Sequence, residues 1–290
     1  MVTGGSKGIG LEISREFYRR GARVTLVART AADLEAAERS LRGDGEGAGE
    51  VGSAVADTCS LSALRAAVSR GEREFGPVDV VVCNAGFSRP GRFEDLDEAN
   101  FQRHVDVNYM GTVRTLKAVL PGMRERGRGQ VVIVASALAV TGFAGYSSYA
   151  PSKWALRGLA DCLRNELQGT GVGVSVGYPP DTKTPGYEEE ERSKPEICRA
   201  VNAALGSELF DAQVVARNMV DDIVAKRYHL RGPDVGQNLL VEATAGLSPA
   251  ALPAALSALV SILRVVVDAV LAGLRLRADR AARAVNQRRR

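Results

Sequence analysis

The stretch TGGSKGIG, residues 3–10, stands almost at the beginning of this chain of 290 residues. Four of its eight residues are glycine, and apolar residues then recur at helical spacing at Ile9, Ile13 and Phe17, as far as Gly21. Glycines let backbone N–H groups come close to a ligand, and the N-terminus of a following helix adds partial positive charge, which suits a phosphate group. Taken alone, such a stretch is equally compatible with an ordinary tight turn, but its position at the start of a helix favours a phosphate-binding turn.

Short apolar runs and helical stretches alternate along the rest of the chain. This alternation predicts a doubly wound α/β fold, in which helices cover both faces of a parallel sheet. Ligands of such folds bind at the carboxyl ends of the strands. The runs that predict strands are 23–29, 51–57, 78–86, 129–136 and 171–180, and those that predict helices are 31–42, 60–75, 98–126 and 147–170.

The strand that should precede the glycine-rich turn is largely missing. Only Met1 and Val2 stand before Thr3, whereas the phosphate-binding turn of a doubly wound fold follows a central strand. We therefore expect the neighbouring strands to lose part of their hydrogen-bonding partner. We interpret the sequence as having a shortened start, such as a wrongly assigned initiator methionine would give, rather than as a new way to build the sheet.

Composition excludes several classes of protein. Hydrophobic residues make up 45% of the chain, which excludes global disorder. The four cysteines form no Cys-x-x-Cys pair, and the chain has only two histidines. We therefore predict no metal site, and reduced thiols in a compartment that faces the cytosol. The cysteines are Cys59, Cys83, Cys162 and Cys198, and the histidines are His104 and His229.

The C-terminal segment differs from the rest of the chain. Residues 247–276 are mostly apolar, and the chain from 247 to 290 holds eight arginines against two aspartates. A span that carried Arg264 and Asp268 near its middle would be costly in a bilayer, so we predict a helix that lies in the membrane interface. The alternative is a helix packed on the body of the protein or on a second copy. Nucleic acid is not expected as a partner, because no aromatic residues accompany the arginines.

These patterns divide the chain into three parts. A doubly wound domain is predicted over residues 1–235, followed by a membrane-associating helical extension over 236–276. The basic residues 277–290 are predicted to form a disordered tail.

The end of the second predicted strand carries a basic residue. An acidic side chain there would hydrogen-bond the ribose 2′-hydroxyl of NAD, but this chain has Arg29, 19 residues after Gly10, and Lys7 lies within the turn. Two cations suit a 2′-phosphate, so the pattern favours NADP(H) over NAD(H). The alternative is that Arg29 is a solvated surface residue.

Tyr149 and Lys153 lie one turn apart on one face of a predicted helix. A phenol titrates near ~10, and an adjacent ammonium lowers that pKa by roughly 1–3 units, which would make Tyr149 a proton donor near neutral pH. Ser136, at the end of the preceding predicted strand, would hydrogen-bond the same substrate oxygen. Taken alone, the Tyr–Lys pair is equally compatible with a surface pair.

Together these motifs resemble the short-chain dehydrogenase/reductase family over residues 1 to about 230. The resemblance implies that Tyr149 donates a proton to the substrate, that Ser136 orients the substrate, and that Lys153 also binds the nicotinamide ribose. Asn108 would hold a water of the proton relay. The family's usual Tyr-Ser-Ala-Ser-Lys is here Tyr-Ala-Pro-Ser-Lys, and Pro151 is tolerated because it falls in the first helical turn.

The same resemblance implies a set of contacts to NADPH. Residues of the turn would hold the pyrophosphate, Asp57 the adenine, and Thr182 and Thr184 the carboxamide end. The implied contacts are Thr3, Gly4, Gly5, Ser6, Lys7, Gly8, Ile9, Gly10, Arg29, Asp57, Asn84, Ala85, Gly86, Tyr149, Lys153, Pro179, Thr182 and Thr184.

A narrower resemblance comes from YPPDTKTPGYEEEERSKPE, residues 178–196, together with GRFEDLD at 91–97, LVAR at 26–29 and RGLAD at 157–161. These stretches are similar to those of the 3-ketodihydrosphingosine reductases, a subgroup of the family. The resemblance implies NADPH-dependent reduction of the 3-keto group of 3-ketodihydrosphingosine, a long-chain amino ketone, in sphingolipid synthesis. It places the protein at the endoplasmic reticulum membrane, with its catalytic domain facing the cytosol.

The substrate of this subgroup carries an ammonium on the carbon beside its ketone. Asp181 lies in the loop expected to cover the nicotinamide, where a carboxylate would favour that ammonium. The alternative is that Asp181 caps its own loop through backbone N–H groups. We expect Glu188–Glu191 to form a solvated face.

Two other functions stay open at this point. The chain could reduce another lipid carbonyl, such as a steroid, a retinoid or a 3-oxoacyl group, or it could be an inactive NADP-binding relative that serves as a scaffold. The complete set of Asn108, Ser136, Tyr149 and Lys153 favours an enzyme, whereas the shortened first strand favours the scaffold. A homo-oligomer also stays open.

Overall fold

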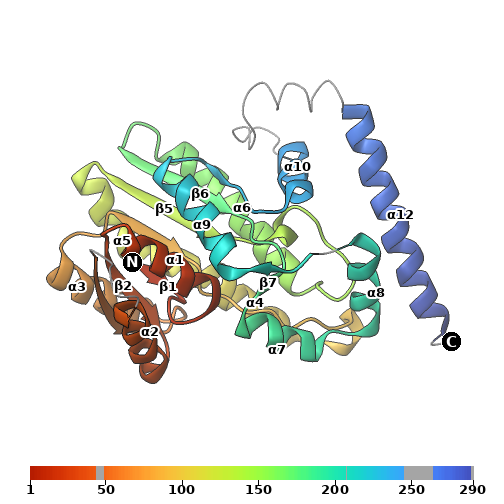
Figure 1. Ribbon diagram of the computed structural model, residues 1–290, viewed down its shortest axis with the longest axis horizontal. Helices are drawn as coiled ribbons and strands as arrows, with labels where there is room; N and C mark the ends of the chain where they lie inside the picture. Colours follow the sequence, from red (N-terminus) through yellow and green to blue (C-terminus); the bar gives the residue numbers. More distant parts are fainter. Residues whose placement is uncertain (44–48, 207, 245–263, 289–290) are drawn as a thin grey trace.

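The computed structural model describes residues 1–43, 49–206, 208–244 and 264–288. At its centre lies a parallel sheet of seven strands in the order β3-β2-β1-β4-β5-β6-β9, covered by helices on both faces (Figure 1). This is the doubly wound α/β fold that the sequence predicts. The strands of the sheet are β1 Val2–Thr3, β2 Arg23–Ala28, β3 Glu50–Val55, β4 Val80–Cys83, β5 Gly129–Val134, β6 Val172–Gly177 and β9 His229–Leu230.

Helices follow most of the strands, and a second small sheet pairs β7 Thr182–Lys183 with β8 Phe210–Asp211. Three short turns interrupt the pattern: the 3₁₀ turns Phe93–Asp95 and Ala137–Ala139, and the π-helical turn Val105–Met110 between α4 and α5. The helices are α1 Gly8–Arg19, α2 Ala31–Gly43, α3 Leu61–Phe75, α4 Glu98–His104, α5 Gly111–Arg126, α6 Tyr149–Glu166, α7 Pro185–Ser193, α8 Glu196–Leu205, α9 Ala212–Val224, α10 Val235–Ala243 and α12 Arg264–Arg288.

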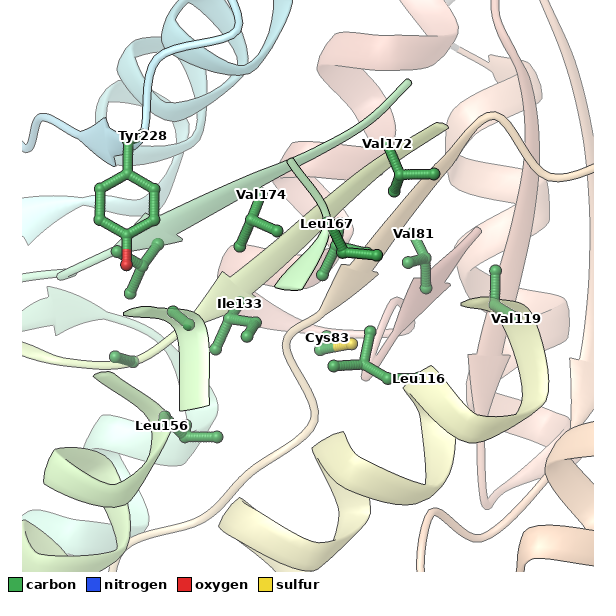
Figure 2. Packing of buried hydrophobic residues seen from close by; sticks show 14 of the residues in the cluster. Val81, Cys83, Leu116, Val119, Ile133, Leu156, Leu167, Val172, Val174 and Tyr228 are labelled. Atoms are coloured by element: carbon green, nitrogen blue, oxygen red, sulfur yellow. The ribbon is translucent and has the colours of Figure 1, made fainter. Parts of the chain in front are cut away.

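Alternate residues of the central strands pack into cores on opposite sides of the sheet. Val81, Cys83 and Ile133 pack with residues of α5 and α6 on one side (Figure 2). Val82 and Val132 pack with residues of α1 and α9 on the other side. Because both faces are buried, these strands are continuous apolar runs rather than alternating ones.

The first strand has only two residues but still lies at the centre of the sheet. Val2 pairs in parallel with Leu26 of β2 and with Val82 of β4. Before it, the Met1 ammonium donates to the Val80 carbonyl at 2.9 Å. A cavity of about 300 Å³ lies between the first residues of β2 and β4, where the strand would continue. The expectation of a largely missing first strand is confirmed, and the sheet keeps the gap.

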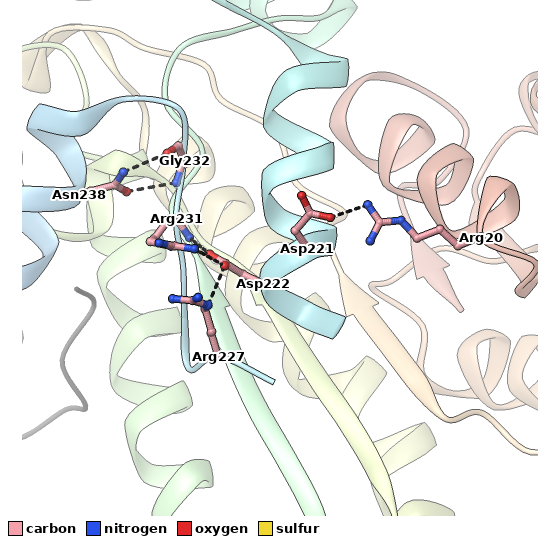
Figure 3. Close-up of polar contacts among 7 residues, drawn as sticks. All are labelled: Arg20, Asp221, Asp222, Arg227, Arg231, Gly232 and Asn238. Atoms are coloured by element: carbon pink, nitrogen blue, oxygen red, sulfur yellow. Dashed lines mark hydrogen bonds and ion pairs between the residues drawn. The ribbon is translucent and has the colours of Figure 1, made fainter. Parts of the chain in front are cut away.

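A buried carboxylate fastens α9 to the chain that leads into α10. Asp222 is 3% exposed and accepts hydrogen bonds from the Arg231 backbone N–H and guanidinium, both at 2.8 Å, and it pairs with Arg227 at 3.0 Å (Figure 3). Gly232 then exchanges two hydrogen bonds with the Asn238 side chain. Removing a partner of a buried charge is strongly destabilising, so this cluster fixes where α10 begins.

The end of the chain differs from the predicted division. Residues 277–288 belong to helix α12 and are not a disordered tail. They are helical because α12 packs along α8 (Figure 1), where Val285 is buried and Asn286 accepts a hydrogen bond from Arg92 at 2.9 Å. None of the described helices is long and apolar enough to cross a membrane. Much of the predicted extension, 245–263, and the last two residues lie outside the described residues.

Candidate active site

A cleft runs along the carboxyl ends of the central strands and consists of two adjoining hollows. The larger, of about 370 Å³, lies over the glycine-rich turn and the ends of β2 and β3, and we name it the cradle hollow. The smaller, of about 280 Å³, lies between the ends of β5 and β6 and helix α7, and we name it the catalytic hollow. The two share Ile9, Asn84, Gly86, Thr184 and Gly186 as walls.

The cradle hollow has the shape and charge that a dinucleotide requires. Gly4 and Gly8 have φ of +64° and +56°, a conformation that favours glycine. A Cβ on Gly8 would lie 3.0 Å from the Thr184 side chain, so the cradle has no room for one. The N-terminus of α1 has no side-chain cap, which leaves its backbone N–H groups available to a phosphate.

Most residues predicted to contact the cofactor line the cleft, but three do not. Thr3 is buried, and its hydroxyl accepts the N–H groups of Asn84 and Ala85 at 3.1 and 3.2 Å. A Cβ on Gly10 would lie 2.3 Å from the Gly4 carbonyl, and one on Gly5 would lie 2.9 Å from the Val2 carbonyl. These three residues shape the turn instead of lining the cleft. The predicted cofactor residues that do line it are Gly4, Ser6, Lys7, Gly8, Ile9, Arg29, Asp57, Asn84, Ala85, Gly86, Tyr149, Lys153, Pro179, Thr182 and Thr184.

The two predicted cations of the cradle hollow have different surroundings. Lys7 pairs with Asp33 at 2.7 Å, and Asp33 lines the same hollow. Sequence reasoning missed this acid, although it stands only four residues after Arg29, in the first turn of α2. Within the described residues Arg29 is exposed and makes no ion pair. Arg29 is therefore the more available cation for a ligand in this hollow.

The catalytic hollow brings together Ser136, Tyr149 and Lys153. Ser136 follows β5, and its hydroxyl accepts the Leu138 N–H at 3.2 Å. Tyr149 is the first residue of α6, which accommodates Pro151 as expected. Lys153 lies one turn later, with its ammonium 5.7 Å from the centre of the Tyr149 ring, and donates to the Val134 carbonyl at 3.2 Å. The predicted pair thus shares one helix face and points into the cleft.

The acidity of Tyr149 differs from the expectation. Burial raises the pKa of its phenol, a hydrogen bond with Ser136 lowers it in part, and the charges of Glu190 and Asp181 raise it further. The Lys153 ammonium donates to the Val134 carbonyl, and burial lowers the pKa of Lys153 itself to about 8. Tyr149 is therefore protonated at neutral pH and retains a proton to donate.

Asn108 acts on the site through other residues. It lies in the π-helical turn, a feature often found at functional sites. Its fully buried amide accepts the Phe87 N–H at 3.0 Å and donates to the Phe87 carbonyl at 3.1 Å and to the Ser152 hydroxyl at 3.0 Å. Asn108 thus fixes the chain that follows β4 against α6, and a water-holding role stays a prediction.

The segment after β6 forms the outer wall of the catalytic hollow. Thr184 caps α7 by accepting the Tyr187 N–H at 3.0 Å, and buried Thr182 donates to the Pro180 carbonyl at 2.7 Å. Burial raises the pKa of Asp181 to about 6, with Lys194 opposing that rise. Tyr146 and Glu190 also line this hollow, and sequence reasoning missed both.

Comparison with known proteins agrees with this geometry. The family described as short chain dehydrogenase matches residues 1–195. The chain belongs to the short-chain dehydrogenase/reductase family. It is 36% identical to a 3-dehydrosphinganine reductase of Danio rerio and 35% identical to one of Arabidopsis thaliana. Each alignment covers 86% of this chain, and 75% and 74% of the respective relative.

Solved structures of the family share the fold. An L-sorbose reductase of Gluconobacter frateurii, complexed with NADPH and L-sorbose, is 26% identical with a TM-score of 0.69, over 80% of this chain and 94% of that one. A 3-oxoacyl-[acyl-carrier protein] reductase of Brucella melitensis with bound NAD is 28% identical with a TM-score of 0.64, over 78% and 82%. As a short-chain dehydrogenase/reductase, the protein is an oxidoreductase that uses a nicotinamide cofactor, and the cradle hollow fits the cofactor's phosphates.

Proposed function

We propose that this enzyme reduces the 3-keto group of 3-ketodihydrosphingosine to dihydrosphingosine, a step of sphingolipid synthesis, with NADPH as the reductant. The observation that carries the proposal is the charge of the catalytic hollow. Among the described residues, its walls include four carboxylates and one cation, Lys153. An acidic wall favours a ketone that carries an ammonium over a neutral lipid ketone. The carboxylates are Asp181, Glu190, Glu208 and Asp234.

The names of the relatives support the same substrate. Those from Danio rerio, Bos taurus and Arabidopsis thaliana are called 3-dehydrosphinganine or 3-ketodihydrosphingosine reductase. The stretch at 178–196, which suggests this subgroup from the sequence, forms the outer wall of the catalytic hollow. Recognition of the substrate therefore involves the part of the chain that carries the narrower resemblance.

Three side chains of the hollow perform the protein's part of the reduction. The bound cofactor supplies a hydride to the ketone carbon. Tyr149 donates its phenol proton to the ketone oxygen, a role that its raised pKa permits. The Ser136 hydroxyl accepts the Leu138 N–H and hydrogen-bonds Tyr149, so it lies where it can orient the same oxygen. Lys153 binds the nicotinamide ribose, and Asn108 supports the proton relay.

The preference for NADPH rests on Arg29. A 2′-phosphate adds negative charge beside the end of β2, and Arg29 is the cation there without an ion pair among the described residues. Lys7 contributes less than expected, because Asp33 already balances its charge. The cradle hollow therefore favours NADPH through one arginine rather than two cations.

Helix α12 supports a membrane-bound location. Val266, Val270 and Leu276 are 58%, 58% and 56% exposed, whereas the far end of the helix packs on α8. Exposed apolar side chains on an arginine-rich helix suit the membrane interface. We place the enzyme on the cytosolic face of the endoplasmic reticulum, where its lipid substrate partitions. Assembly into a homo-oligomer stays a prediction.

A substrate comparison tests the proposed function. The full chain is assayed for NADPH oxidation with 3-ketodihydrosphingosine and with a steroid, a retinoid and a 3-oxoacyl ketone. We expect the amino ketone to have the highest kcat/KM. A neutral ketone with a higher kcat/KM would contradict the proposal, and NADPH binding without turnover of any ketone would favour the scaffold.

A further inference from the structure

Helix α7 carries four consecutive glutamates, and the structure divides them into two pairs. Glu188 and Glu189 are exposed, and Glu189 pairs with Arg192 at 2.7 Å on the outer surface. Glu190 and Glu191 turn inward and pair with Lys194, whose side chain is 1% exposed. The sequence predicts a uniform solvated face, and the structure contradicts this. Of the four glutamates only Glu190 lines the catalytic hollow, whereas Glu191 lines a separate pocket beside Lys194.

Glu190 reaches the wall beside the reacting groups. Its Oε1 accepts a hydrogen bond from the Tyr146 hydroxyl at 2.5 Å and lies 3.3 Å from the Lys194 ammonium. The ring of Tyr146 lies 6.0 Å from that of Tyr149, measured between centroids. Glu190 is thus one aromatic side chain away from the phenol, and its charge acts on Asp181, which lines the same hollow.

The charges of this wall do not balance. Asp181, Glu190 and Glu191 surround one buried ammonium, that of Lys194. Exposed Arg199 acts on Glu191, on the side away from the hollow, and Lys153 is directed to the Val134 carbonyl. The side that faces the substrate therefore carries excess negative charge from Asp181 and Glu190. A cation bound beside these two partly buried carboxylates would reduce the electrostatic repulsion between them.

We propose that Glu190 is a specificity-determining residue, which together with Asp181 binds the ammonium of the amino ketone. The inference rests on the proposed function and adds a residue to it. When the ketone oxygen lies between Ser136 and Tyr149, the ammonium on the next carbon faces the wall that holds both carboxylates. Tyr146 and Lys194 keep Glu190 in place, each through a direct contact.

The bound ammonium also acts on the catalytic phenol. In its absence, the charges of Glu190 and Asp181 raise the pKa of Tyr149. An ammonium between these carboxylates and the phenol offsets their field, so Tyr149 becomes a stronger acid when the correct substrate is bound. A neutral ketone does not make Tyr149 a stronger acid in this way. It should therefore have a lower kcat as well as a higher KM.

The test compares charge removal at neighbouring glutamates. Glu190→Gln should lower kcat/KM for 3-ketodihydrosphingosine by roughly 10- to 100-fold, the range of a charge-assisted contact. It should leave the uncharged N-acetyl analogue unchanged or improved. Glu189→Gln, on the outer face of the same helix, should change neither substrate. Equal losses for both substrates in Glu190→Gln would overturn the proposal and leave Glu190 a purely structural role.

A second variant separates the charge of Glu190 from the hydrogen bond that Tyr146 donates to it. Tyr146→Phe removes the hydrogen bond to Glu190 but leaves its carboxylate paired with Lys194, so the preference for the amine over the N-acetyl analogue should persist. Loss of that preference would overturn the proposal. If the unmodified enzyme reduces neither substrate, the proposed function is wrong, but the role of Glu190 in binding the ammonium can still be tested. Calorimetric binding of the amine dihydrosphingosine, weaker in Glu190→Gln than in Glu189→Gln, would still support the recognition site, and equal binding would refute it.

Discussion

At the scale of single residues, the surroundings of Tyr149 keep its phenol protonated. Burial and two carboxylates keep its pKa raised, and Ser136 opposes them. Replacing Tyr149 by Phe keeps the ring but removes the proton. Turnover should fall by ~10²–10⁴-fold, the usual contribution of a general acid. NADPH binding, followed by its fluorescence, should be nearly unchanged. Near-full turnover with bound cofactor would show that another group protonates the ketone.

The proposed preference for NADPH depends on Arg29, at the end of β2 in the cradle hollow. Arg29→Asp should weaken NADPH binding far more than NADH binding, because only NADPH brings a 2′-phosphate to the end of β2. Arg23→Asp is the matched control, since Arg23 is an exposed arginine at the other end of the same strand. Titration of both cofactors against both variants measures the difference. Similar losses of NADPH and NADH affinity in Arg29→Asp would refute the role.

Protonation of Asp181 is expected to lower kcat/KM for the amino ketone at acid pH. Its pKa is raised to about 6, so the carboxylate is charged at pH 7 and becomes neutral as the pH falls through about 6. kcat/KM for the amino ketone should therefore drop on that acid limb. The N-acetyl analogue should not show the drop, because it has no ammonium to bind. Asp181→Asn should remove the limb. An identical acid limb in Asp181→Asn would assign the titration to another group.

At the scale of elements, the short β1 leaves a structural weakness that can be repaired. The gap beside it is a cavity of about 300 Å³, and burial lowers the pKa of the Met1 ammonium to about 6. Adding about four β-branched residues before Met1 would fill the gap with a paired strand. We expect a higher Tm, by about 2–4 °C for each kcal/mol gained. An equally long Gly-Ser extension is the control and should gain little.

The buried Met1 amine before β1 should make the folding stability depend on pH. The Met1 amine titrates near 8 in the unfolded chain but near 6 in the folded one, so between these values the unfolded state binds the proton that the folded state excludes. The stability of the unextended chain should therefore increase as the pH rises from 6 to 8. The β-branched extension should remove this part of the pH dependence. Equal melting curves for the three chains would show that the gap costs no stability.

At the scale of the whole molecule, α12 combines a packed end with an exposed apolar end. Val266→Asp together with Val270→Asp should abolish binding to phosphatidylcholine–phosphatidylserine vesicles without unfolding the protein, because both side chains are exposed. Val224→Asp is the control, since Val224 is an exposed valine on α9. Vesicle sedimentation and thermal melting measure the two effects. Undiminished vesicle binding by the double variant would place the membrane contact elsewhere.

The sequence by itself determined the order of the elements as far as β6, and the kind of site. Both depend on short-range patterns: continuous apolar runs predict buried parallel strands, glycines at 4 and 8 allow a close approach, and a spacing of four puts Tyr149 and Lys153 on one helix face. Even the shortened β1 could be predicted, because a doubly wound sheet requires a strand before the glycine-rich turn. Local geometry is sufficient for each of these inferences.

Only the tertiary structure decided how the charges of the site combine. The approach of Asp33 to Lys7, the hydrogen bond from Tyr146 to Glu190 and the direction of the Lys153 ammonium depend on how the cleft walls meet. The sequence likewise suggests a basic, disordered tail at 277–290, but residues 277–288 belong to helix α12, which packs along α8. Burial and the distance between charges set their energies, and both quantities exist only once distant segments are packed together.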